Sequence, residues 1–315
     1  MSSWKLIVVT DESRPSTNTN VQAGIRRSTV LHGLERLFLV MVVLAVALSV
    51  WTGPLSAQSS DSAPPYRLGL AAFLLYDPDH ALLLFEQCIT QEPQHEDSPQ
   101  GLDCLYWSGR AYAMKAALAW FYRTSIVEGL VKGRWAIGTA LDRYEHVLAK
   151  APNHVGALLS QAEYYMAAPY LPPMAYGDVA KARALVARGL ALDADNPRAH
   201  YLQARLDLYH NNRRDQARTG YARVRYLIEK GIGGVDATLL QRWVEFAQAE
   251  VAFLDEDYPA AIAYADAYIR QVPDGADGYA LKGASLKFMG RAADGEVQIQ
   301  HAQALNPHVR RYREP

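Results

Sequence analysis

Apolar and polar positions repeat in one order along this chain, from about residue 65 to the C-terminus. A short turn with Asp, Asn or Gly leads to a small residue and then to an amphipathic segment with helical spacing. In four copies a proline stands twelve residues after the small one, at Pro93, Pro152, Pro273 and Pro307. Proline ends a helix because it lacks an N–H and clashes with the preceding turn. The small residues that mark the six copies are Ala81, Ala140, Ala182, Ala217, Ala261 and Gly295.

The spacing of these small residues indicates a repeated unit. They lie 59, 42, 35, 44 and 34 positions apart, so a unit of about 34 residues is much enlarged once and slightly enlarged twice. Such a unit has room for two helices, and Ala or Gly at a crossing lets helix axes approach to about 8–10 Å. One hairpin cannot bury both of its apolar faces alone, so neighbours must stack. We therefore predict an all-α stack of about six helical hairpins over residues 65–309.

The preceding helix of each unit carries aromatic, leucine and glycine positions at fixed distances. They are Leu68-Gly69, Gly109 with Tyr112, Tyr201 with Leu208, and Tyr279 with Gly283, while Ala249 replaces Gly in the fifth unit. Together with the small residue and the proline, this sequence pattern resembles the tetratricopeptide repeat (TPR). The resemblance implies a right-handed superhelical stack. Its first helices would line a groove that binds a peptide or a partner domain.

A narrower resemblance covers the third unit. Its sequence AEYYMAAPYLPPMAYGDVAKAR follows the enlarged hairpin and is similar to periplasmic TPR proteins like the T-component of tripartite periplasmic transporters. That resemblance implies an alternative function, a solute-transport accessory protein that binds a transporter component or a small ligand.

Three insertions interrupt the regular repeat. The largest, residues 113–138, has no proline and keeps helical spacing, so we expect it to lengthen both helices of the second hairpin, with a turn near Gly129–Gly133. Its aromatic residues would then cover the end of the stack or form an aromatic patch. These aromatic residues are Trp120, Phe121, Tyr122 and Trp135.

The other two insertions are connections. Residues 169–176 contain three prolines, which predict a stiff, non-helical loop that either contacts a partner or packs on its own hairpin. Residues 231–234 contain three glycines but lack the strand and the Lys-Ser/Thr of a phosphate loop. We interpret this segment as a flexible link between the fourth and fifth units.

The N-terminus predicts the compartment. An uncharged apolar run, Leu37–Trp51, follows Arg26, Arg27 and Arg36 and precedes small residues up to Ala57. This order is typical of a secretory signal, and with the residues up to Ala57 it is also long enough for an uncleaved anchor. In both cases the positive residues before the run place the rest of the chain outside the cytoplasm.

The sequence therefore predicts five segments. They are a polar, disordered leader (1–36), a hydrophobic signal or anchor helix (37–57), a linker (58–64), the α-solenoid (65–309) and a basic tail (310–315). We expect the protein to be exported to the cell envelope, either periplasmic or anchored in the inner membrane, and to contact the membrane through its N-terminal segment.

The two cysteines, Cys88 and Cys104, agree with export. In an oxidising compartment two nearby cysteines favour a disulfide, and the alternative is a pair of buried thiols. We predict the disulfide because the N-terminal signal implies export independently.

The charged residues add only local information about possible partners. The formal net charge of −1 gives no global attraction to nucleic acid, so we expect no nucleic-acid partner. Acidic residues face a single base, Arg67, between Gln58 and Leu105, and basic residues dominate from Asp195 to Lys230. The basic segment is either a set of solvated helix faces or a patch for an acidic partner. Its members are Arg198, Arg205, Arg213, Arg214, Arg218, Arg223, Arg225 and Lys230.

No catalytic or metal-binding motif accompanies the repeat. The sequence lacks HExxH, paired CxxC, GxSxG and a Walker-type loop. We therefore expect no enzyme activity, no cofactor and no metal, and predict a scaffold that binds another envelope protein or peptide. The pattern gives no prediction of the oligomeric state. The candidate partner-binding residues are Tyr106, Arg110, Tyr164, Tyr170, Tyr176, Tyr201, Arg205, Arg213, Arg214 and Tyr279.

Overall fold

The computed structural model describes residues 64–91, 98–121, 126–168, 170–171 and 175–312. The predicted leader, the predicted signal or anchor helix and nearly all of the predicted linker lie outside these residues, and so does Tyr122. Within the described residues, no helix has the length and apolar character needed to span a membrane.

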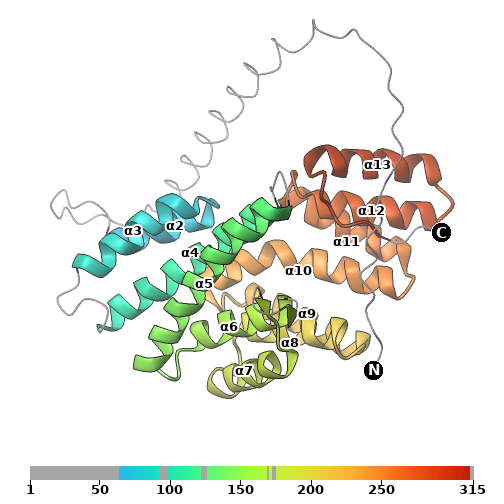
Figure 1. Ribbon diagram of the computed structural model, residues 1–315. Helices are drawn as coiled ribbons and strands as arrows, with labels where there is room; N and C mark the ends of the chain where they lie inside the picture. Colours follow the sequence, from blue (N-terminus) through green and yellow to red (C-terminus); the bar gives the residue numbers. More distant parts are fainter. Residues whose placement is uncertain (1–63, 92–97, 122–125, 169, 172–174, 313–315) are drawn as a thin grey trace, which may run out of the picture. The chain divides into compact units, whose positions relative to one another are not determined.

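Six antiparallel helical hairpins follow one another along the described chain, as predicted (Figure 1). The hairpins are α2 (Pro65–Leu74) with α3 (Pro78–Gln91), α4 (Pro99–Phe121) with α5 (Ile126–Lys150), α6 (Val155–Ala167) with α7 (Val179–Leu192), α8 (Pro197–Tyr209) with α9 (Arg214–Glu229), α10 (Gly234–Leu254) with α11 (Tyr258–Gln271), and α12 (Ala276–Phe288) with α13 (Ala292–Leu305).

The two helices of a hairpin have different neighbours in the stack. The first helices α2, α4, α6, α8, α10 and α12 contact one another in succession, whereas each second helix packs against the first helix of the next hairpin. We call the first helices together the inner row. This row is continuous along the stack, so its exposed side chains form one connected surface.

The small residues lie where the repeat predicts them. Ala81, Ala140, Ala182, Ala217 and Ala261 are fully buried. In the last hairpin, a Cβ added to Gly283 or to Gly295 would come within 2.7 Å of the other residue's carbonyl oxygen. The two backbones therefore touch at this crossing, and a side chain there would force the helices apart.

The glycine link between α9 and α10 is a tight turn. Gly231, Gly233 and Gly234 have φ values of 72°, 108° and 52°, which glycine adopts at little cost. A Cβ on Gly233 would lie 2.3 Å from Cγ of Pro197, so the close approach of α8 also requires glycine there. The predicted position of this link is confirmed.

The predicted turn in the long second hairpin is wrong. Gly129 and Gly133 lie inside α5, which already begins at Ile126. A Cβ on Gly133 would be 3.5 Å from the carbonyl oxygen of Ala116 on α4, which is an ordinary contact distance, so the packing of the two helices does not require glycine there. Trp135 on α5 is 60% exposed and meets Tyr112 edge to face at 5.5 Å. The side chains of Trp120 and Phe121 lie outside the description.

The described residues of the third hairpin's connection, 170–171 and 175–178, are non-helical and include a short ribbon, whereas its three prolines lie outside the described residues. Strands β1 (Tyr170–Leu171) and β2 (Ala175–Tyr176) pair antiparallel, with Tyr170 opposite Tyr176. Beyond the ribbon, the backbone N–H of Asp178 donates to the carbonyl oxygen of Tyr165 at 2.9 Å. This bond ties the end of the connection back to α6.

Cys88 on α3 and Cys104 on α4 form a disulfide with a Cα–Cα distance of 6.2 Å, which confirms the predicted pairing. It joins the first hairpin to the second. Closing a loop of this length stabilises a fold by about 3 kcal/mol on the chain-entropy model.

Candidate interaction surface on the inner row

A hydrogen-bonded network of charged side chains crosses the middle of the inner row. Arg198 of α8, whose side chain is only 5% exposed, donates to the hydroxyl of Tyr106 at 3.0 Å and to Glu163 of α6 at 2.8 Å. Arg110 of α4 donates to the same hydroxyl at 3.2 Å and to Asp236 of α10 at 2.5 Å. The members of this central network are Tyr106, Arg110, Ser160, Glu163, Arg198 and Asp236, and they link four hairpins.

The two acids of the central network are held in their charged form. The surrounding protein desolvates Glu163 and would raise its pKa, but Arg198 and Arg110 outweigh this effect and lower it. Desolvation likewise opposes the ionisation of Asp236, and Arg110 and Arg198 lower its pKa. The side chain of Glu163 is still 44% exposed, although three arginines act on it.

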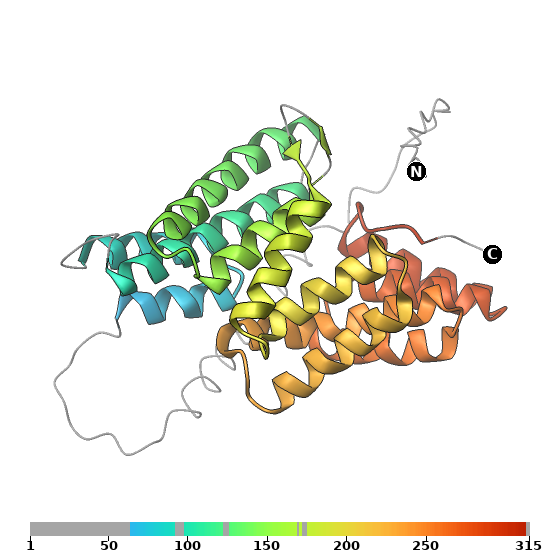
Figure 2. The same ribbon diagram turned by 90° about the horizontal axis from the view of Figure 1, so that it is seen from below.

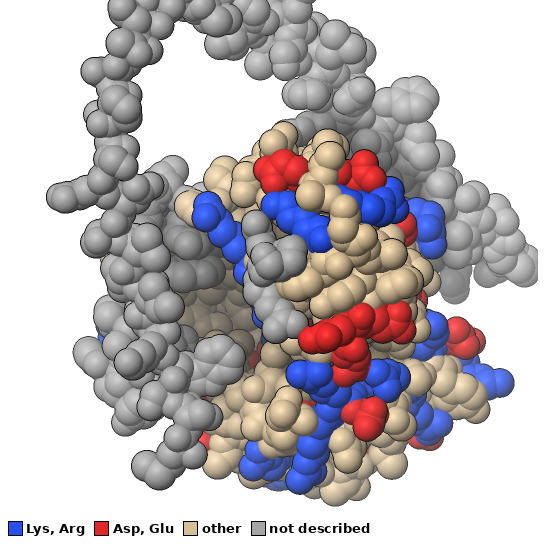
Figure 3. Space-filling view, turned by 90° about the vertical axis from the view of Figure 1, so that its right-hand side faces the viewer, with Lys and Arg blue, Asp and Glu red and all other residues tan. Residues whose placement is uncertain are grey.

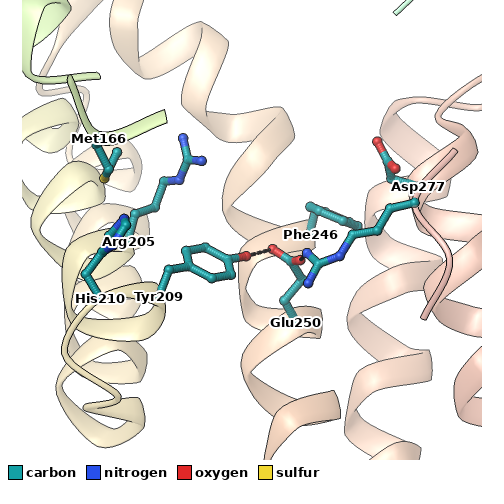
Figure 4. Close-up of a pocket in the computed structure, with 8 residues that line it drawn as sticks. Met166, Arg205, Tyr209, His210, Phe246, Glu250 and Asp277 are labelled. Atoms are coloured by element: carbon teal, nitrogen blue, oxygen red, sulfur yellow. Dashed lines mark hydrogen bonds and ion pairs between the residues drawn. The ribbon is translucent and has the colours of Figure 1, made fainter. Parts of the chain in front are cut away.

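A cavity of about 440 Å³ opens next to the central network, toward the C-terminal end of the inner row (Figure 4). We call it the pocket. Helices α6, α8, α10 and α12 and the segment after α13 contribute its walls. Its lining residues are Met166, Arg205, Tyr209, His210, Phe246, Glu250, Asp277 and Arg310.

The acids of the pocket have raised pKa values, in contrast to the acids of the central network. Burial raises the pKa of Glu250, and the hydrogen bond from Tyr209 and the charges of Arg310 and Arg205 only partly offset it. Burial also raises the pKa of Asp277, against the influence of Arg310. Figure 4 shows the hydroxyl of Tyr209, on α8, pointing at the carboxylate of Glu250, and Arg310 is the second donor to Glu250. At both acids, desolvation therefore outweighs the stabilisation that the neighbouring donors and charges give to the carboxylate.

Arg205 is the pocket residue with the most available charge. In Figure 4 the guanidinium of Arg205 extends from α8, and no dashed line reaches it. Within the described part of the chain, Arg205 makes no ion pair or hydrogen bond. Its guanidinium carbon lies 6.0 Å from the ring centroid of Tyr201. Burial raises the pKa of Tyr201 to about 12, so this phenol stays neutral. A partly buried cation without an anion is suited to binding an acidic group.

Four of the predicted partner-binding residues lie on this surface. Tyr106 and Arg110 belong to the central network, and Tyr201 and Arg205 lie beside the pocket. Tyr164, on α6, meets Tyr165 edge to face at 5.3 Å. Tyr170 and Tyr176 are placed only by their backbone, in the ribbon.

The remaining predicted residues have structural contacts elsewhere. Tyr279 donates to the carbonyl oxygen of Pro273 and meets His301 of α13, so it packs on the last hairpin. Arg214 binds the carbonyl oxygen of Leu254, and Arg213 is exposed where α9 begins. The structure does not bring these three residues to the pocket.

The basic segment carries its own counter-charges, which favours solvated helix faces over a bare basic patch. Arg214 and Arg218 both reach Asp255, Arg223 pairs with Asp195 at 2.5 Å, and Arg225 pairs with Glu245 at 2.9 Å. Figure 3 shows basic and acidic groups side by side on the face in view, where neither sign covers the surface.

Sequence reasoning missed most of the acids and two of the arginines that shape this surface. The sequence places Arg198 in the basic segment, either on a solvated helix face or in a basic patch, although it is buried and paired with Glu163. It places Arg310 in a basic tail, although Arg310 pairs with Glu250 at 2.6 Å. One signal was available: Glu163, Asp236, Glu250 and Asp277 all lie on predicted first helices, which line the groove in helical repeats.

Comparison with known proteins gives structural neighbours only. No protein-family model matches the chain, and no curated protein matches it. The solved structure of TTC0263, a thermophilic TPR protein from Thermus thermophilus, aligns with a TM-score of 0.47 and 19% identity, over 74% of this chain and 97% of that one. The MamA protein aligns with a TM-score of 0.38 and 15% identity, over 62% of this chain and 91% of that one. The hairpins, their inner row and their small-residue crossings make the described chain a TPR-like repeat protein.

Proposed function

We propose that this protein is a non-catalytic scaffold of the cell envelope that binds a segment of a partner protein along its inner row, in the pocket. The observation that carries the proposal is Arg205, a partly buried guanidinium with no anion partner among the described residues, at the wall of a cavity of about 440 Å³. The pocket also offers an apolar side, from Met166 and Phe246. An acidic group on the partner would pair with Arg205, and a neighbouring apolar side chain would fill the space.

The chemistry of the pocket supports binding more than catalysis. Its acids are engaged by Tyr209 and Arg310, and among the described residues no nucleophile with an adjacent base lines the cavity. Its residues come from four consecutive hairpins, so a bound chain segment would contact several repeats at once. This is how helical repeats use their extended concave surfaces.

Panning of a random peptide display library on the immobilised chain tests this function. We expect the wild type to enrich peptides with an acidic residue beside an apolar one, and Arg205→Glu to lose them. Arg213→Glu is the matched control, because this arginine is exposed at the start of α9, and it should enrich the same peptides as the wild type. Equal enrichment by the two charge reversals, or none by the wild type, would contradict the proposal.

The envelope location is the second part of the proposal. It is supported by the apolar run Leu37–Trp51, by the basic residues before it, and by the Cys88–Cys104 disulfide, which persists in oxidising compartments. The mass of the mature chain, with and without reduction, tests it. We expect the reduced chain to be heavier than the unreduced chain by two hydrogen atoms, because reduction of the disulfide gives two thiols. An intact Met1 with free thiols would argue against export.

A further inference from the structure

The chain's own C-terminal segment, residues 306–312, returns to the inner row after the last helix. Asn306 turns the chain, since its carbonyl oxygen accepts from the N–H of Val309 at 3.0 Å and its side chain accepts from the N–H of His308 at 2.8 Å. The segment then runs without helix, in dark red in Figure 2. Val309 is buried against the last hairpin, in a cluster with Ala276, Ala280, Ala302 and Leu305. We call residues 306–312 the tail.

Arg310 places the tail in the pocket. Its guanidinium donates to Oε1 of Glu250 at 2.6 Å, and its backbone N–H donates to the carboxylate of Asp277. One residue thus engages both pocket acids. The Arg310 side chain remains 55% exposed, in contrast to Arg198 of the central network, so solvent can compete for this contact.

Tyr312 fits its site imperfectly. Its ring lies 5.3 Å from that of Phe253 on α10, and the guanidinium carbon of Arg310 lies 5.0 Å from its centroid. Its hydroxyl is buried, yet it has no hydrogen-bond partner among the described residues. A buried polar group without a partner is costly, so the tail binds less well than an otherwise equal segment without this hydroxyl.

The charge balance indicates what else the site accepts. Without Arg310, Glu250 would lose its guanidinium partner, and Asp277 would lose a backbone N–H donor and a nearby positive charge. Glu250 therefore selects a basic side chain, and the aromatic cluster around Phe253 selects an aromatic residue two positions later.

We propose that the tail is an internal ligand that occupies part of the pocket, and that the partner displaces it with a segment in which an arginine is followed two residues later by an aromatic side chain. This inference rests on the proposed function, because it names the chemistry of the partner that the pocket takes. The contacts of the tail described above do not involve Arg205. Arg205 stays available for an acidic group elsewhere in the partner segment.

A synthetic peptide of residues 306–312 (Asn-Pro-His-Val-Arg-Arg-Tyr) with a fluorophore at its N-terminus tests the inference on the full chain. The double variant Arg310→Glu/Tyr312→Ala removes both anchors of the tail. We expect the peptide to bind this variant at least tenfold more tightly than the wild type, because an attached tail competes at an effective concentration of about millimolar. Adding Glu250→Gln and Asp277→Asn to the double variant should weaken binding about tenfold. Equal helical circular dichroism of all forms would show that they fold.

Two altered peptides separate this role from simple capping of the last hairpin. A peptide with Arg310→Ala should bind the double variant at least tenfold more weakly, whereas a cap held by Val309 and Tyr312 alone would bind it unchanged. A peptide with Tyr312→Phe should bind about fivefold more tightly, because it lacks the unpaired hydroxyl. The inference is overturned if the wild type binds the peptide as tightly as the double variant, or if the double variant binds no peptide. Panning on the wild type with Arg205→Glu still tests the proposed function in that event.

Discussion

The central network and the pocket lie next to each other on the inner row, yet the pKa values of their acids are shifted in opposite directions. In the central network, Arg110 and Arg198 face Glu163 and Asp236, and both acids have lowered pKa values. In the pocket, Glu250 and Asp277 have raised pKa values. The difference depends on where the cations come from.

Both cations of the central network are fixed on helices of the stack, and their side chains are at most 13% exposed. Each reaches across to another hairpin, so the pairs hold the register between repeats. The cation that pairs with Glu250 in the pocket, Arg310, belongs to the tail, and its side chain is 55% exposed. A site whose counter-charges lie on its own helices is complete without a ligand. A site whose cation lies on the C-terminal tail can exchange that cation for one from a partner. The first arrangement is structural, and the second is suited to recognition.

The largest expected difference between the two regions is in the free energy of unfolding after one arginine is replaced in each. Arg198→Ala should destabilise the fold by about 3–5 kcal/mol, because it leaves Glu163, Ser160 and the Tyr106 hydroxyl without their buried donor. Arg310→Ala should cost less, about 1–2 kcal/mol, because the Arg310 side chain is 55% exposed and Glu250, which is only 9% exposed, keeps the hydrogen bond from Tyr209. Urea unfolding at neutral pH, followed by circular dichroism, measures both.

Both substitutions remove an arginine that donates to a glutamate on a first helix, so each is the control for the other. Equal losses of unfolding free energy would show that the two regions do not differ as described. Arg198→Lys should recover part of the loss, since it keeps the charge but cannot serve three acceptors with one planar group.

The hairpins could be predicted because their signals are local. A small residue, a helical period and a closing proline all lie within one helix, and every predicted crossing residue is buried. The predicted turn at Gly129–Gly133 was wrong because glycine was interpreted as a break, while α5 continues through both positions. Glycine lowers helix propensity by only about 1 kcal/mol, and the contacts of a long helix can outweigh this cost.

The candidate site was only partly predictable, because its contacts join distant repeats. Tyr106, Arg110, Tyr201 and Arg205 could be found from their places on first helices. The partner of Arg110, however, lies 126 residues further along the chain, and the partner of Arg310 lies 60 residues before it. No period in the sequence connects such residues, and the packing of the hairpins decides which charges meet.

A smaller effect should appear in the pH dependence of stability, and its sign differs between the two regions. Glu250 and Asp277 have folded pKa values above their unfolded values, so their ionisation at neutral pH costs stability, which returns as the pH falls through the folded pKa. Glu163 and Asp236 have lowered folded pKa values. Their contribution is complete above the unfolded pKa of about 4 and is lost only as the pH falls through the lower folded pKa.

Unfolding free energies of two double variants, compared with the wild type between about pH 7 and pH 3, would measure this difference. As the pH falls from 7, the wild type should gain stability relative to Glu250→Gln/Asp277→Asn, because only the wild type can take up protons in the pocket. Relative to Glu163→Gln/Asp236→Asn, its advantage should stay constant until the pH approaches about 4 and then shrink. Parallel curves for the two variants would mean that the pocket acids are as well compensated as those of the central network. In that case Arg310 would be a fixed counter-ion, with no reason for a partner's arginine to replace it.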